Sequence, residues 1–136
     1  MNTIGVRVLQ AVVSGLLAGC GEKLPPYSQE RLPSGRVIKM QSYLPEQLFT
    51  GEEALLLKFV PDAALRDEAA LDAEVAAVWK DLMRDAQQRP GTKLVLIRAI
   101  SPTTNGWDEG GQVQYVYRLQ SDGTWSMQKD PEIRLR

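Results

Sequence analysis

The feature that most constrains the fold is one long segment with helical periodicity, residues 63–88, which stands among segments with the alternation of β-strands. Four apolar residues recur in it at spacings of four, three and four, as one face of a helix requires: Leu71, Val75, Val78 and Leu82. Asp62 is the expected N-cap residue, and Pro90-Gly91 ends the segment. We interpret the charged residues on the opposite side as a solvated face: Arg66, Asp67, Glu74, Lys80, Asp81, Arg84 and Asp85.

Strand patterns cover five other segments: residues 36–44, 53–60, 93–100, 112–120 and 124–128. In the first of them, Met40 and Leu44 are expected on one face and Tyr43 on the other. The second and third are apolar on both faces, interrupted by Lys58 in one and by Arg98 in the other. Such strands are typical of the interior of a sheet.

The predicted order is two strands, one helix and three strands, with a hairpin at Ser121-Asp122-Gly123. One amphipathic helix cannot cover both faces of a five-stranded sheet. We therefore expect an α+β fold, a two-layer sandwich with the helix on one face of a mostly antiparallel sheet. The two strands that flank the helix should be central, and Trp79 and Trp125 should lie in the core. The domain is expected to span residues 35–130, followed by a tail at residues 131–136.

The amino-acid composition excludes several kinds of catalytic and metal site. The chain of 136 residues contains no histidine, which excludes Ser-His-Asp triads, Cys-His pairs and His-ligated zinc. Carboxylate pairs, Ser-Lys pairs and oxygen-ligated metals remain available. The 16 Lys and Arg residues are balanced by 17 Asp and Glu residues, so the chain has no excess of cations for binding nucleic acid. We assign no catalytic residue, no metal ligand, no cofactor and no nucleic-acid partner.

The N-terminal region has the pattern of a secretory signal. Residues 1–7 contain one basic side chain, Arg7, and residues 8–17 form a mostly apolar run. An apolar run of about ten residues suits a signal peptide and is well short of the roughly 20 that a membrane-spanning helix needs. The run ends in Leu17-Ala18-Gly19-Cys20, which contains the only cysteine.

These four residues resemble the lipobox of bacterial lipoproteins, in which leucine and two small residues precede the cysteine. The resemblance implies a signal peptide at residues 1–19, cleavage between Gly19 and Cys20, and lipid chains on the Cys20 sulfur and on the new N-terminus. Two or more acyl chains anchor a protein stably, whereas one is marginal. The alternative is a packed N-terminal helix that ends at a buried thiol.

The lipoprotein resemblance also predicts a location. Because Gly21 and not an aspartate follows the cysteine, it implies an outer-membrane anchor facing the periplasm, with the inner membrane and the cell surface as alternatives. Residues 20–34 then comprise the lipidated cysteine and a proline-containing tether. The alternative for the second half of this tether is an edge segment that lies on the domain.

Residues 101–111 form the first candidate site, because this segment is longer than a connection between two strands requires. Trp107 within it either caps the core or stands out as the anchor for a protein partner, since tryptophan is enriched at binding hot spots. Asp108 and Glu109, which follow directly, are the weaker alternative of an acid/base pair.

The second candidate site is the sheet face that the helix leaves uncovered. Tyr115 and Tyr117 share one face of the predicted strand 112–120. Either these tyrosines or the residues that alternate with them, Gln112, Gln114, Arg118 and Gln120, lie on the uncovered face, where they would bind a flat or extended partner. The alternative for the tyrosines is that they pack against the helix.

Together these features predict a lipid-anchored envelope protein that acts by binding another protein, specifically an inhibitor or immunity protein that presents residues 101–111 to an enzyme acting in the periplasm. One alternative is a structural or assembly accessory of an outer-membrane machine, and another is a small enzyme that uses carboxylates or a Ser-Lys pair. A rigid loop bearing Trp107 would favour the inhibitor, an exposed sheet edge the accessory, and a deep pocket with buried carboxylates the enzyme.

Overall fold

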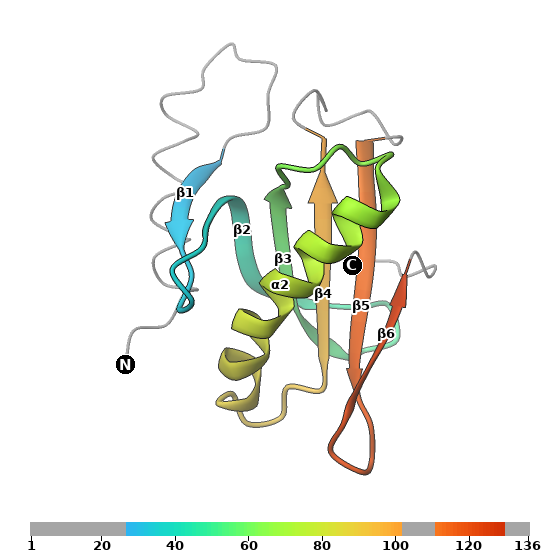
Figure 1. Ribbon diagram of the computed structural model, residues 1–136. Coiled ribbons are helices and arrows are strands. Elements are labelled where there is room, and N and C mark those ends of the chain that lie inside the picture. Colours follow the sequence, from blue (N-terminus) through green and yellow to red (C-terminus); the bar gives the residue numbers. More distant parts are fainter. Residues whose placement is uncertain (1–26, 102–110, 130–136) are drawn as a thin grey trace.

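The computed structural model describes residues 27–101 and 111–129, in which one helix lies across one face of a six-stranded sheet (Figure 1). The α+β class predicted from the sequence is therefore confirmed. In chain order the elements are β1 (Ser28–Arg31), β2 (Val37–Gln47), β3 (Glu53–Val60), α2 (Glu68–Gln87), β4 (Leu94–Ile100), β5 (Gln112–Leu119) and β6 (Trp125–Lys129). No described helix is both long enough and apolar enough to cross a membrane.

The strands lie in the sheet in the order in which they occur in the chain, β1-β2-β3-β4-β5-β6. Every neighbouring pair is antiparallel except β3 and β4, which are parallel. Parallel neighbours need a long crossover, and α2 provides it. The two strands that flank the helix are thus central, as their apolar residues on both faces predicted.

A sixth strand corrects the prediction of five strands and of a tether up to residue 34. β1 pairs antiparallel with β2, with Gln29 opposite Lys39. A tight turn joins them: Leu32 N donates to Arg36 O at 2.7 Å, and Gly35, at φ 97°, adopts a conformation that disfavours residues with a side chain. Leu32 is buried in the core. The alternative interpretation, an edge segment on the domain, holds for this part of the chain.

Helix α2 begins five residues later than predicted, and Asp62 is not its N-cap. Asp67 caps the helix, because its side chain accepts a hydrogen bond from Ala70 N at 3.3 Å. The backbone N–H groups of Asp62 and Ala63 donate instead to the two carboxylate oxygens of Glu74, each at 2.9 Å. Glu74 therefore holds the turn after β3 against the helix, and the helix begins only after that turn.

The main core lies between α2 and the sheet. The four apolar residues of the predicted helix face are fully buried there: Leu71, Val75, Val78 and Leu82. Trp79 and Trp125 are partly buried against this core, as expected. The Trp79 ring stacks on Tyr117 at a centroid distance of 4.0 Å and meets Trp125 edge to face at 5.2 Å.

A β-bulge in β2 overturns the predicted face of Tyr43. The pairing register with β3 shifts between Met40 and Ser42, so Met40 and Tyr43 both point into the core beneath α2. Leu44 then lies on the opposite face, beside Leu56 of β3.

The charged side of α2 is not uniformly solvated, which corrects a second prediction. Asp81 is buried, and it accepts hydrogen bonds from Ser34 N and Oγ at 2.9 and 2.7 Å. Asp85 accepts from the Tyr43 hydroxyl at 2.6 Å. The β1–β2 turn and a sheet tyrosine reach these carboxylates from the rest of the fold, whereas Lys80 on the same helix is exposed.

Candidate functional site

The first candidate site and the lipobox lie outside the described residues. This applies to Leu17, Ala18, Gly19 and Cys20, and also to Trp107, Asp108 and Glu109. The two residues that bracket the 102–110 segment are described: Ser101 N donates to Gly111 O at 2.6 Å, at the end of the sheet where β4 stops and β5 starts.

Tyr115 and Tyr117 do not lie on the uncovered face, so the second candidate site is wrong as far as these residues are concerned. Both are buried beneath α2, which confirms the alternative that they pack against the helix. The Tyr115 hydroxyl donates to Asp72 Oδ1 at 2.5 Å. Burial, with a smaller contribution from the Asp72 carboxylate, raises the pKa of Tyr117 to about 12. These tyrosines fasten the helix to the sheet.

Part of the sheet face opposite α2 is covered by the chain's own β2–β3 connection. Figure 1 shows this connection passing behind β4 and β5. Arg118 Nη1 of β5 and Glu52 Oε2 of the connection form an ion pair at 2.9 Å. A second apolar cluster forms beneath it: Leu48, Ala54, Leu56, Leu94, Leu96 and Val116.

Next to this second cluster, polar side chains of the three strands β3, β4 and β5 lie side by side. Lys58 is the register partner of Arg98, and Arg98 is the register partner of Gln114. We call these three residues the basic row. Since side chains two residues apart share a face, the row lies on the same face as Leu56 and Leu96, away from the helix.

The guanidinium of Arg98 is held in place by its neighbour in the row. Arg98 Nε and Nη2 both donate to Gln114 Oε1, at 3.2 and 2.6 Å. Lys58 and Arg98 are each half-buried. The described residues form no ion pair with either cation; Glu46 of β2, in register with Ala54 of β3, is the carboxylate that acts on both from further away.

Burial and the repulsion between like charges both disfavour the charged forms of Lys58 and Arg98. Burial lowers the pKa of Lys58, the positive charge of Arg98 lowers it further, and Glu46 acts in the opposite direction. Burial also lowers the pKa of Arg98. Like charges on directly neighbouring strand positions destabilise a sheet. The row is thus a costly arrangement at the centre of the sheet, on the face away from α2.

The sequence carries a signal for this row, although Lys58 and Arg98 are not among the predicted site residues and Gln114 enters only as one of the residues that alternate with Tyr115 and Tyr117. Lys58 and Arg98 each interrupt a strand that is otherwise apolar on both faces. In the sequence each is an isolated charge. Only the parallel register of β3 and β4 brings them together.

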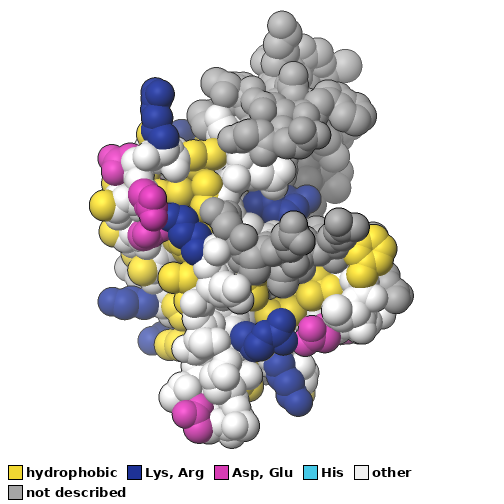
Figure 2. All heavy atoms as spheres, turned by 90° about the vertical axis from the view of Figure 1, so that its right-hand side faces the viewer, with side chains coloured by type: hydrophobic (Ala, Val, Ile, Leu, Met, Phe, Trp, Pro, Cys, Tyr) yellow, Lys and Arg dark blue, Asp and Glu magenta, His cyan; other side chains and the backbone are white. Residues whose placement is uncertain are grey.

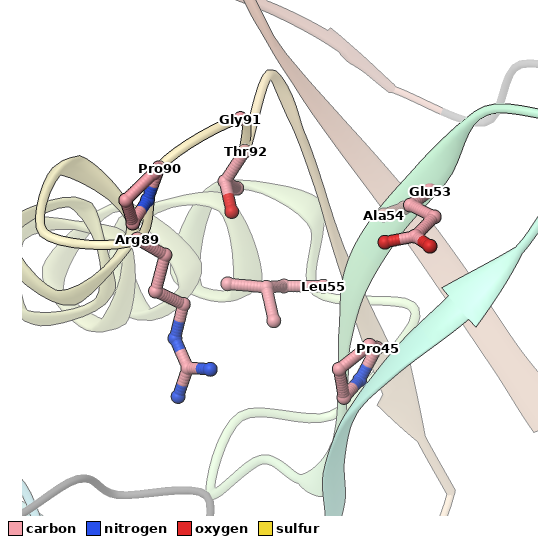
Figure 3. A pocket seen from close by; sticks show the side chains of 8 residues that line it. All are labelled: Pro45, Glu53, Ala54, Leu55, Arg89, Pro90, Gly91 and Thr92. Atoms are coloured by element: carbon pink, nitrogen blue, oxygen red, sulfur yellow. The ribbon is translucent and has the colours of Figure 1, made fainter.

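A hollow of about 290 Å³ lies beside the C-terminal end of α2 (Figure 3). Its lining comes from β2, β3 and the segment after α2: Pro45, Glu53, Ala54, Leu55, Arg89, Pro90, Gly91 and Thr92. Glu53 is the only carboxylate among these residues and is exposed. Arg89 is engaged with Asp85, with its Nε 3.0 Å from Oδ2. The hollow therefore does not match the pocket with buried carboxylates that would favour an enzyme.

The described residues contain no group of three Cys, Asp or Glu side chains that could hold a metal ion. Comparison of the chain with protein-family models, with curated proteins and with solved structures gives no match.

Proposed function

We propose that this chain is a lipid-anchored protein of the bacterial cell envelope that acts by binding another protein, specifically as an inhibitor or immunity protein for an enzyme that acts in the periplasm. The anchor rests on Leu17-Ala18-Gly19-Cys20 at the end of a short apolar run. The observation that carries protein binding is the basic row, whose half-buried cations stand beside apolar residues on a sheet face without an ion-pair partner among the described residues.

The composition of this face supports contact with a protein. Binding hot spots are enriched in arginine and are surrounded by contacts that exclude water. Arg98 stands at the centre of the sheet, with the second apolar cluster on one side along the strands. Val60 and Ile100 follow on the other side, two residues further along the same strands.

The anchor is tested by Cys20→Ser in a bacterial host fed a fatty-acid analogue that can be labelled. We expect label on the wild-type chain and on a control variant outside the motif, Thr3→Ser, and none on Cys20→Ser, because the thioether needs the cysteine sulfur. Equal label on Cys20→Ser would contradict the lipid anchor.

Binding is tested by affinity capture from detergent-solubilised envelope with the full lipidated chain. We expect one enriched protein, and if it is an enzyme, its activity should fall when the purified chain is added. Trp107→Ala tests the contribution of residues 101–111. If Trp107 anchors the partner, the variant should lose about 2 kcal/mol or more of binding free energy, about thirtyfold in affinity, while its melting midpoint stays unchanged. A lower melting midpoint with unchanged affinity would instead assign Trp107 to the core.

One observation supports the accessory alternative. β6 pairs with β5 on one side, and no described strand pairs with its other edge. Met127 of β6 is 51% exposed, and Figure 2, which views the molecule from this side, has hydrophobic side chains at the surface among charged ones. Such an edge suits the addition of a partner's strand. Capture of several subunits of one outer-membrane assembly, without inhibition of an enzyme, would favour this alternative.

A further inference from the structure

The backbone fixes the positions of the two cations in the row. Lys58 and Arg98 are directly opposite each other on the two central strands, which are hydrogen-bonded on both sides. Sites on such rigid elements hold their side chains more accurately than sites on loops. The two positive charges would nevertheless be better separated if stability alone were at stake, because neighbouring like charges repel and their half-burial costs solvation.

Among the described residues, the donors of Lys58 and Arg98 are only partly used. Arg98 has five N–H donors, and Gln114 Oε1 accepts one from Nε and one from Nη2, which leaves both N–H groups of Nη1 and the second N–H of Nη2. Lys58 adds three donors, and the described residues supply no hydrogen-bond acceptor for them. By fixing one edge of the guanidinium, Gln114 directs its remaining donors. A planar carboxylate matches such a fork.

The charge balance favours a singly charged anion. The row contributes two positive charges, and the Glu46 carboxylate offsets part of them from a distance. What remains is a small positive excess between apolar residues: Leu56 and Leu96 on one side, Val60 and Ile100 on the other. A carboxylate on an aliphatic stem fits these surroundings better than a doubly charged and strongly hydrated phosphate.

We propose that Lys58 and Arg98 together bind the side-chain carboxylate of an Asp or Glu on the protein partner, with Gln114 positioning the guanidinium. This rests on the proposed function, because it names the chemistry of the partner. The partner should therefore present an acidic residue surrounded by apolar ones.

The test is a calorimetric titration of the full chain in neutral detergent with capped hexaglutamate peptide. The row variant, Lys58→Gln with Arg98→Gln, should bind the peptide at least about tenfold more weakly than the wild type. The control, Lys80→Gln with Arg84→Gln, removes the same charge from exposed positions of α2 and should change affinity less than about twofold. Equal losses in the two variants would mean non-specific attraction and would overturn the proposal.

Further variants and other anions complete the test. Glu46→Gln should tighten peptide binding, because it removes the competing carboxylate, whereas Glu68→Gln on the helix side should not. Lys58→Gln alone retains the Arg98–Gln114 hydrogen bonds and covers the case that the double variant does not fold. Tighter binding of inorganic phosphate than of the peptide, or row-dependent binding of phosphatidylglycerol vesicles, would assign the row to another anion and refute the partner carboxylate.

Affinity capture from detergent-solubilised envelope, repeated with the row variant, distinguishes failure of this inference from failure of the proposed function. A partner held equally by the wild type and by the row variant would leave the proposed function standing and overturn the role of the row. No partner for either chain would contradict the proposed function itself. A partner lost from the row variant alone, and retained by the Lys80→Gln and Arg84→Gln control, is the result that we expect.

Discussion

The buried carboxylate of Asp81 offers a quantitative test of how the β1–β2 turn is held on the helix. Asp81 is 7% exposed, and its two oxygens accept from Ser34 N at 2.9 Å and from Ser34 Oγ at 2.7 Å, across 47 residues of sequence. Hydrogen bonds to a charged group contribute about 1.5–3 kcal/mol each. Because Ser34 itself is exposed, water replaces part of that contribution. We therefore expect Asp81→Ala to lower the free energy of unfolding by about 2–4 kcal/mol.

A double-mutant cycle isolates the contact. Ser34→Ala removes the hydroxyl and keeps the backbone donor, so it should cost about 1–2 kcal/mol. In the Asp81→Ala background the same change should cost much less, which gives a coupling energy of about 1 kcal/mol or more. Lys80→Ala, an exposed neighbour of Asp81 on the helix, is the control and should stay within about 0.5 kcal/mol.

Urea denaturation of a chain that starts after Cys20 measures these energies, provided that the slope with urea is the same for all variants. Hydrogen exchange adds a local readout: the Leu32 amide, which donates to Arg36 O within the turn, should lose protection in Asp81→Ala beyond the global loss of stability. Additivity of the two substitutions within about 0.3 kcal/mol would refute the contact as an energetic link.

Two further predictions concern the same helix. Leu82 is fully buried, so Leu82→Ala should cost about 2–5 kcal/mol, whereas the exposed Arg84→Ala should stay within about 0.5 kcal/mol; equal losses in urea melts would mean that the helix face is assigned wrongly. The hydrogen bond from Tyr115, followed by that from Lys129, lowers the pKa of Asp72 below its usual 3.8, so the folded state binds this proton less readily than the unfolded state. The resulting stabilisation is complete above pH 3.8 and is lost as the pH falls through 3.8 toward the lower pKa of the folded state. Asp72→Asn should therefore flatten the loss of melting temperature at acid pH, whereas the control Arg84→Ala should not. An unchanged acid slope in Asp72→Asn would contradict the assignment.

Local patterns were sufficient for much of the fold. Periodicity identified the helix and its buried face, because that face repeats at 3.6 residues whatever it packs against. Because β3 and β4 carry apolar side chains on both faces, they were expected at the centre of the sheet, where both faces of a strand are covered. The lipobox is equally local, and it remains a prediction together with the role of Trp107.

The contacts that define the candidate site join residues far apart in the chain, and no local pattern encodes their register. Lys58 and Arg98 were visible as isolated charges, but only the parallel pairing of β3 and β4 makes them neighbours. The bulge after Met40 turned Tyr43 into the core, and the β1–β2 turn buried Asp81, although the same residue types usually lie in solvent. The sequence by itself determined the elements and their apolar faces, because those depend on spacings of a few residues. The tertiary structure decided which polar side chains meet, because burial, hydrogen-bond partners and charge proximity are properties of packed elements.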